Sequence, residues 1–315
     1  MVSNTVTIEG RSFALSRLDK VLWPQDGYTK GELINYYVEV APYILPHLRG
    51  RPMVFTRYPD GIEKQSFYQK NAPPSLPEWV NTFTYYSSDS KRDINFILVE
   101  ESATLVWLAN QACIEMHPWL SCAGSVDYPD FAVFDLDPSP GNSFEQVRTI
   151  ALLTRRVLNE LGLRSYIKTS GSQGLHVYLP VENEYSYEEI RDFGRSVAEI
   201  ICTMQPDIAT IERTVRKRGA KIYVDYLQNV KGKTLCSAYS VRPRDGATVS
   251  APLNWDEVSN VKPSDFTIKT ILPRLQKLGE LFAPVLTDRQ SLETAFSQLG
   301  LKMGNGASGA SGDGS

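Results

Sequence analysis

Several features that would place the chain in a familiar class are missing from its sequence. The 315 residues include no apolar run of about 18 residues, so no segment is predicted to span a membrane. The first residues contain neither a basic region nor an apolar stretch, which argues against a secretory signal. The four cysteines are scattered and form no C-x-x-C pair, so neither a zinc site nor a disulfide framework is indicated. We therefore expect a protein of the reducing cytoplasm.

The sequence also lacks an overall excess of positive charge. Its formal net charge is -3, so a nucleic-acid partner would have to bind a local basic patch. The one dense basic run lies at residues 213–218, which includes Arg218, and Lys221 follows it. A solvated loop is the usual explanation of such a run, and contacts with phosphate groups are the alternative. Arg242 and Arg244 leave the same two interpretations open.

The most informative feature present is a pair of carboxylates at the end of an apolar segment. Residues 131–137 predict a buried strand that ends at Pro138, and strand alternation places Asp135 and Asp137 on the same face. Two adjacent carboxylates repel each other and lose hydration, and a divalent cation relieves both costs. Mg²⁺ or Mn²⁺ at this position would suit phosphoryl transfer with two metal ions. Turn carboxylates that merely cap a strand are the alternative.

A third carboxylate, Asp225, lies among apolar residues of a strand predicted at 221–227. A charged residue in such a place is costly unless it is paired or bound to a metal. We expect Asp225 to face Asp135 and Asp137 from an adjacent strand. An ion pair with a nearby basic residue, Lys221 or Arg218, is the alternative.

A Gly/Ser turn at residues 169–174 joins two predicted strands. Its backbone N–H groups and the hydroxyls of Ser170 and Ser172 suit a triphosphate, although its glycines would equally serve an ordinary hairpin. His176 begins the following strand. We expect it either to orient Asp137 or a phosphate, or to be a core histidine.

Further candidates lie nearer the N-terminus. His117 is predicted to close a helix just before a proline, where it would bind a sugar hydroxyl or cap the helix. Lys20 and Lys30 flank a turn and are expected to converge on one phosphate, unless both are ordinary surface lysines. Phe67 and Tyr68 are expected to stack on nucleobases, unless one of them belongs to the core.

Helical and strand patterns are mixed along the chain, which predicts an α/β fold with strands that return as hairpins. A capping box at residues 29–32 starts a helix that we expect to run to about Val40. A helix over 268–278 should kink or restart at Pro273, and a final helix is expected over 289–299. Residues 304–315 are almost entirely Gly, Ser and Ala and predict a flexible tail or linker.

The order of seven short motifs is more specific than any one of them. D-K-V-L-W-P, F-Y-x-K, E-x-H-P-W, F-D-L-D-P, S-G-S-x-G-L-H-V, V-D-Y-L-Q-N and S-V-R-P-R together resemble the polymerase domain of bacterial ATP-dependent DNA ligase D, of the archaeo-eukaryotic primase superfamily. The resemblance implies a primase-polymerase-like α/β (α+β) core with a mostly antiparallel, RRM-like sheet flanked by helices. It implies one such domain over residues 1–300, with an N-terminal subregion of about 1–125 and a catalytic core of about 126–260.

The resemblance also implies roles for the candidate residues. By similarity, Asp135, Asp137 and Asp225 are catalytic metal ligands, with Mn²⁺ preferred and Mg²⁺ possible, and an NTP is the substrate. Residues that contact the incoming nucleotide or the metal site are Ser170, Ser172, His176, Arg218, Lys221, Gln228, Arg242 and Arg244.

The same similarity extends to the DNA. His117 falls where the family senses the ribose 2′-hydroxyl, which favours ribonucleotides. Lys20 and Lys30 fall where it holds a DNA 5′-phosphate, and Phe67 and Tyr68 fall at an aromatic pair that meets the template strand.

The function implied is template-directed nucleotidyl transfer that fills gaps and extends ends at 5′-phosphorylated DNA breaks in non-homologous end joining. Ku and a DNA ligase are the implied partners, and the nucleoid is the implied location. One alternative is a primer-synthesising primase, although the scattered cysteines do not suit its usual zinc or iron–sulfur module. The others are a non-catalytic DNA end-bridging protein and a metal-dependent nuclease.

The chain departs from the family pattern at a few positions. Gln173 stands where many relatives carry Lys, which removes one charge from the phosphate-binding turn. Tyr68 replaces a second Phe, and Arg17 stands where a smaller amide residue can help to hold the 5′-phosphate. No K-x-D-G adenylation motif of a ligase is found.

Overall fold

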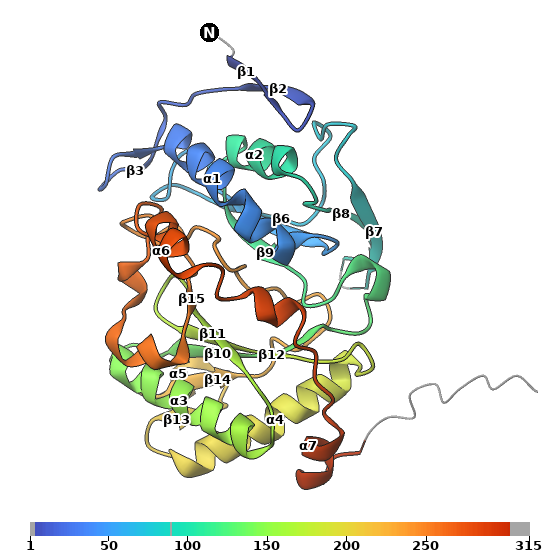
Figure 1. The fold of residues 1–315 in the computed structure, drawn as a ribbon, viewed down its shortest axis with the longest axis vertical. Helices are drawn as coiled ribbons and strands as arrows, with labels where there is room; N and C mark the ends of the chain where they lie inside the picture. The colour runs from blue at the N-terminus through green and yellow to red at the C-terminus, as the bar shows by residue number, and fades with distance from the viewer. Residues whose placement is uncertain (1–3, 89, 303–315) are drawn as a thin grey trace, which may run out of the picture.

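Two β-sheets organise the chain in the computed structural model, which describes residues 4–88 and 90–302. In Figure 1 the N-terminal elements, in blue to teal, lie above a six-stranded sheet, and the helices α3 and α4 lie below that sheet. The tail predicted at residues 304–315 lies outside the described residues. None of the described helices is long and apolar enough to cross a membrane.

Two short hairpins precede the first long helix. They are formed by β1 (Asn4–Ile8) with β2 (Arg11–Leu15), and by β3 (Val21–Trp23) with β4 (Tyr28–Thr29). The helix α1 (Lys30–Leu48) begins with the predicted capping box, in which Thr29 and Glu32 satisfy each other's backbone N–H groups. It runs beyond the predicted end at Val40, because its apolar stripe continues through the fully buried Ile44 and Leu48.

The upper sheet has five strands, and β5 pairs with three of the others. The strands are β5 (Met53–Arg57), β6 (Phe67–Gln69), β7 (Thr82–Ser87), β8 (Arg92–Ile97) and β9 (Cys113–Pro118). The helix α2 (Ser102–Asn110) packs against α1.

The prediction that His117 closes a helix is wrong, because His117 lies in β9 opposite Val54 of β5. The chain leaves α2 through Ala112, whose φ of 56° is incompatible with a continuing helix, and then turns back as a strand.

The lower sheet has the strand order β13-β14-β10-β12-β11-β15 and is antiparallel except between β13 and β14. Its strands are β10 (Phe131–Pro138), β11 (Tyr166–Thr169), β12 (Leu175–Pro180), β13 (Ala209–Thr210), β14 (Ile222–Asp225) and β15 (Pro252–Leu253). The helices α3 (Phe144–Glu160) and α4 (Tyr187–Met204) cover one face, and each begins with a capping box. The predicted mixed α/β class is confirmed.

The C-terminal part is less helical than the sequence predicts. The helix α6 begins only at Ile271 and ends at Leu278, so Pro273 lies in its first turn, where a missing N–H breaks no helical bond and causes no kink. The helix α7 is confined to Glu293–Gln298, because Gln290 forms an isolated β-bridge with Val181. The side-chain amide of Gln290 also accepts a hydrogen bond from the Arg164 N–H and donates one to the Arg164 carbonyl. A single turn, α5 (Val215–Arg218), carries the basic run.

One large apolar cluster contains residues of both sheets and of the helices on either side, and a smaller one lies beneath β7 and β8. The division into subregions near residue 125 stays a prediction. The strand β10 directs Phe134 towards α4, so its alternate residues Asp135 and Asp137 point to the opposite face, towards the N-terminal elements.

Candidate active site

Strand register places four ionisable side chains in a row across the lower sheet. Asp225 of β14 lies directly opposite Asp135 of β10, which lies opposite His176 of β12, which lies opposite Lys168 of β11. Directly opposed residues on adjacent strands share one face, with Cβ atoms about 5 Å apart. Asp137 lies two residues along β10 on the same face. The predicted approach of Asp225 to Asp135 and Asp137 is thus a consequence of register.

The three carboxylates lie close together, and their surroundings raise the pKa of each. Burial raises the pKa of Asp137, and the charges of Asp135 and Asp225 raise it further. Burial also raises the pKa of Asp135, against the opposing charges of Lys168, Arg242 and Arg218. The side chain of Asp137 makes no hydrogen bond or ion pair with any other described residue. Such a cluster is unfavourable alone and favourable around a cation.

Asp225 is oriented by neutral donors, so the alternative of an ion pair with Lys221 or Arg218 is not found. Its Oδ1 accepts hydrogen bonds from the Tyr223 hydroxyl at 3.0 Å and from the Leu227 N–H at 2.9 Å. Its Oδ2 accepts from the Gln228 amide at 2.9 Å. Burial and Asp135 raise the pKa of Asp225. Gln228 therefore contacts the carboxylate cluster, and its predicted contact with the nucleotide or the metal site stays a prediction.

The donor chemistry of this cluster fits a divalent cation. Carboxylate oxygens are the ligands that Mg²⁺ and Mn²⁺ prefer, and Asp135 Oδ1 has no hydrogen-bond donor among the described residues. Among the described residues, no three His, Cys, Asp or Glu side chains are already arranged to hold one ion. The carboxylates would therefore have to converge further around a cation, and their role as metal ligands stays a prediction.

The Gly/Ser turn lies against the end of β10. The Ser170 hydroxyl accepts hydrogen bonds from the N–H groups of Ser172 and Gly174 at 3.1 and 3.0 Å, which gives the turn a fixed shape. A side chain at Gly174 would have its Cβ only 2.4 Å from the Leu136 carbonyl oxygen and 3.6 Å from Asp137 Oδ1. Only glycine permits this approach, which brings the turn beside Asp137.

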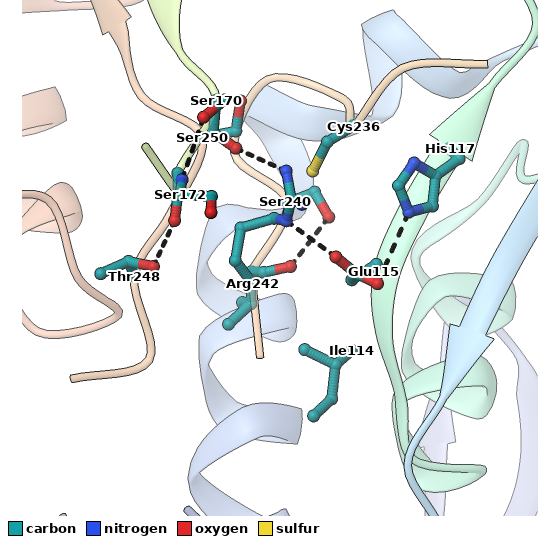
Figure 2. A network of polar contacts seen from close by, with 12 residues as sticks. Ile114, Glu115, His117, Ser170, Ser172, Cys236, Ser240, Arg242, Thr248 and Ser250 are labelled. Atoms are coloured by element: carbon teal, nitrogen blue, oxygen red, sulfur yellow. Dashed lines mark hydrogen bonds and ion pairs between the residues drawn. The ribbon is translucent and has the colours of Figure 1, made fainter. Parts of the chain in front are cut away.

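Arg242 connects this turn to the upper sheet (Figure 2). Its Nη1 donates to the Ser170 carbonyl at 2.7 Å, and its Nε lies 2.7 Å from Oε1 of Glu115 on β9. The other oxygen of Glu115 lies 3.8 Å from His117 Nε2. Although burial opposes ionisation, the neighbouring His117 and the charge of Arg242 lower the pKa of Glu115 to about 2. Glu115 was not among the predicted site residues, although it belongs to the E-x-H-P-W motif.

His176 contacts Asp135, whereas the sequence predicted an interaction with Asp137 or a phosphate, or a place in the core. Its Nε2 lies 3.2 Å from Asp135 Oδ1, within ion-pair range but not aligned as a hydrogen bond. Antiparallel register explains the choice, because His176 is directly opposite Asp135. Its Nδ1 lies 2.7 Å from Nζ of Lys168, a buried residue that was not among the predicted site residues.

The remaining basic candidates differ in how close they lie to the carboxylates. The Arg218 guanidinium carbon lies 3.8 Å from the ring centroid of Tyr223, and its charge acts on Asp135 and Asp137. Lys221 makes its polar contact elsewhere, since its Nζ donates a hydrogen bond to the Pro206 carbonyl at 2.6 Å. The Arg244 side chain is exposed and has no polar partner among the described residues.

Lys20 and Lys30 meet at a second site in the N-terminal part. Both line a cavity of about 590 Å³ with Arg17 and Arg57. Lys30 is only 4% exposed, and its Nζ donates to Asn110 O and Oδ1 at 3.1 Å. Burial lowers the pKa of Lys30, and the charges of Arg17 and Lys20 lower it further. Both lysines therefore line one cavity, and Lys30 is not an ordinary surface lysine, whereas a shared phosphate stays a prediction.

Phe67 and Tyr68 are both outside the core, with 43% and 53% of their surfaces exposed. As neighbours on β6 they point to opposite faces. The Arg57 guanidinium lies 4.9 Å from the Phe67 ring centroid, beside the Lys20–Lys30 cavity. The Tyr68 ring lies 6.5 Å from the His117 ring, and Tyr68 lines a cavity together with Gln228. The two rings therefore border different sites.

Known proteins resemble most of the chain. A family model described as LigD, primase-polymerase domain, matches residues 29–282. The bifunctional non-homologous end joining protein LigD of Bacillus subtilis (strain 168) is 38% identical over 264 residues, which are 83% of this chain and 42% of that protein. The multifunctional non-homologous end joining protein LigD of Mycolicibacterium smegmatis is 34% identical over 278 residues, or 87% of this chain and 36% of that protein. The chain thus spans less than half the length of these relatives.

A solved structure also matches. The polymerase domain of Mycobacterium tuberculosis ligase D, in complex with DNA, superposes with a TM-score of 0.81 and 29% sequence identity. The match covers 88% of this chain and 99% of that chain, which confirms the predicted primase-polymerase-like fold.

Proposed function

The chain belongs to the LigD primase-polymerase domain family, and from this premise we propose that it is a metal-dependent nucleotidyltransferase acting on DNA ends in non-homologous end joining. The observation that carries the proposal is the row of strand partners that brings Asp225, Asp135 and Asp137 together beside the Ser170–Gly174 turn. Carboxylates beside an anion-binding turn suit the transfer of a nucleotide from a triphosphate.

In the proposed reaction, the primer 3′-oxygen forms a bond to the α-phosphorus while the bond to the β-phosphate oxygen breaks and pyrophosphate leaves. Mn²⁺ or Mg²⁺ held by Asp135, Asp137 and Asp225 would supply the charge that ionises the 3′-hydroxyl and balances the phosphates. The turn N–H groups and the guanidinium groups of Arg242 and Arg218 would stabilise the negative charge that develops on the phosphate oxygens.

We propose further that the substrate is an NTP opposite a template, with ribonucleotides preferred. His117 is fixed near Glu115 at the edge of the same network and offers its ring to a sugar hydroxyl. Arg244 and Ser172 would contact the triphosphate, whereas Lys221 would have to leave the Pro206 carbonyl to do so.

The second site suits the DNA itself. The Lys20–Lys30 cavity concentrates positive charge and would hold the 5′-phosphate at a gap or break, with Phe67 stacking nearby. The names of the relatives support a role in end joining, in which Ku and a DNA ligase would be the partners.

The test is primer extension on a one-nucleotide gap that carries a 5′-phosphate. We expect extension that needs Mn²⁺ or Mg²⁺, uses rNTPs better than dNTPs and is absent in Asp137→Ala. Binding of the gap without extension would instead support the end-bridging alternative, and shortening of the primer would support a nuclease.

A further inference from the structure

A cavity of about 370 Å³ lies beyond the end of β10, next to the Gly/Ser turn. Its lining includes Pro138 and Ser139, which directly follow Asp137 in the chain. It also includes Ser172 and Gln173 of the turn. The cavity therefore begins where the carboxylates of β10 end, and it continues the surface that the turn offers to a triphosphate.

The chemistry of the lining favours an anion. Of the residues that line the cavity, only Lys262 carries a charge. Lys262 is exposed, and its ammonium makes no hydrogen bond or ion pair with any described residue. Asp265, the acidic residue nearest to it in the sequence, accepts a hydrogen bond at 2.7 Å from the backbone N–H of Lys262 and not from the ammonium. The ammonium is therefore available to a ligand.

Ser139 adds a polar group that lacks a partner. The residue is only 4% exposed, and its hydroxyl makes no hydrogen bond with any described residue. A buried hydroxyl in this condition is unfavourable, and an acceptor oxygen of a ligand in the cavity would relieve the cost. The backbone N–H of Ser139 already donates to Asn142 Oδ1 at 2.9 Å, so the loop has a fixed shape before any ligand binds.

The segment that carries Lys262 is held in place by the helix α3. Nη2 of Arg148 donates a hydrogen bond to the Val261 carbonyl at 2.6 Å, between residues that are 113 positions apart in the chain. The same guanidinium lies 5.1 Å from the ring centroid of Phe144, which itself lines the cavity. The position of Lys262 beside the cavity is thus a consequence of tertiary packing.

We infer that this cavity binds the terminal phosphate of the NTP, through Lys262 and the Ser139 hydroxyl, and so distinguishes a triphosphate from a diphosphate. The inference rests on the proposed function, which places the α-phosphate at the aspartates and the triphosphate along the turn. The order Asp135, Asp137, Ser139 leads from the middle of the carboxylate row to the cavity. The terminal phosphate carries the most negative charge of the three, which suits the one cation of the lining.

The test compares the affinities of the full chain for ATP and ADP, with Mn²⁺ present and DNA absent, by isothermal titration calorimetry. The wild-type protein should bind ATP more tightly than ADP. In Lys262→Ala we expect the affinity for ATP to fall about tenfold, the effect of one charge-assisted contact, and the affinity for ADP to stay within about twofold. Equal losses for the two nucleotides, or no loss for ATP, would overturn the inference.

A matched control removes a lysine elsewhere in the C-terminal part. Lys277 of α6 is also exposed, has no polar partner among the described residues and does not line the cavity. Lys277→Ala should leave both affinities unchanged. A similar loss of ATP affinity in this variant would mean that general positive charge, and not the cavity, is responsible.

Two further variants test the other borders of the cavity. Gln173→Lys adds a positive charge from the turn, so in combination with Lys262→Ala it should restore most of the affinity for ATP. A double variant as weak as Lys262→Ala would contradict a shared phosphate. Ser139→Ala should weaken ATP binding by about threefold and leave ADP binding unchanged, as expected for one neutral hydrogen bond. An unchanged affinity for ATP would contradict the part assigned to Ser139.

Because nucleotide binding is measured without a primer, the inference and the proposed function fail separately. A protein that prefers ATP to ADP through Lys262 but extends no primer would overturn the proposed function and leave the phosphate site intact. A protein that extends primers, and whose Lys262→Ala variant binds ATP as the wild type does, would overturn the phosphate site alone.

Discussion

The carboxylate row and the Lys20–Lys30 cavity are two sites of opposite charge, and each contains groups that repel one another. In the row, burial and mutual repulsion raise the pKa values of Asp137 and Asp225. In the cavity, burial and neighbouring positive charges lower the pKa of Lys30. In both cases the shift disfavours the charged form, so each site is stabilised by a ligand of the opposite sign.

The two sites differ in how much of the structure fixes them. The row is fixed by the register of adjacent strands, and Asp135 Oδ1 has no hydrogen-bond donor among the described residues. The cavity combines one fixed lysine with one adjustable lysine, because Lys30 is buried against Asn110 whereas Lys20 pairs with the exposed Asp60 at 2.6 Å. The difference suggests that the row sets the chemistry, and that the cavity tunes affinity for one DNA end.

The largest effect should come from Asp137→Ala, which removes one carboxylate of the row and leaves the Lys20–Lys30 cavity unchanged. Loss of a metal ligand removes several kcal/mol of transition-state stabilisation, or about a 10³-fold loss in extension rate. Binding to a 5′-phosphorylated gap should stay within about twofold of wild type, because the cavity is intact. Single-turnover extension and fluorescence anisotropy measure the two quantities. Loss of both together would indicate misfolding or a shared structural role.

Glu115→Gln tests the link between the row and the upper sheet. Without the carboxylate, Arg242 loses its partner at 2.7 Å and is less well held against the Ser170 carbonyl. Truncating one member of a buried charge pair typically costs 2–5 kcal/mol, so we expect KM for the NTP to rise by at least about tenfold. The preference for rNTP over dNTP should fall as well, because His117 loses the same partner. A lower kcat with KM and sugar preference unchanged would contradict this role.

Lys20→Ala and Asp60→Asn should change DNA affinity in opposite directions. Removing Lys20 should weaken binding to a 5′-phosphorylated gap by about tenfold, the effect of one charge-assisted contact, and spare the unphosphorylated gap. Asp60→Asn keeps Lys20 and removes its competing partner, so it should tighten binding to the phosphorylated gap. Equal changes on both DNA substrates would argue against a 5′-phosphate site.

The smallest effect concerns stability of the ion-free protein. The pKa values of Asp135 and Asp137 are raised in the folded state, so folding favours their protonated form. This contribution to the free energy of unfolding is complete below about pH 4 and is lost as the pH rises towards neutrality. Asp137→Asn removes one of the repelling charges, so it should stabilise the ion-free protein at pH 7.5 by about 1 kcal/mol. Thermal unfolding with a chelator measures this, and the gain should vanish at pH 4. A lower Tm for Asp137→Asn at pH 7.5 would mean that the carboxylates are not repelling.

The sequence determines much of this molecule through local rules. Strand alternation alone places Asp135 and Asp137 on one face, and the capping boxes at Thr29, Ser143 and Ser186 begin three helices. The order of the motifs indicates the family and hence the fold. These features depend on neighbours in the chain, so a sequence pattern is enough to predict them.

Only the tertiary structure decides which distant residues meet. Register across the lower sheet pairs His176 with Asp135 instead of Asp137. It also places Lys168 directly opposite His176, although no local sequence pattern predicts that neighbour. Because β9 pairs with β5, His117 lies in a strand and not at the end of a helix. Glu115 of the same strand contacts Arg242, which is distant in the sequence. Pairing and burial depend on long-range packing, which is why the chain's own order of residues does not reveal them.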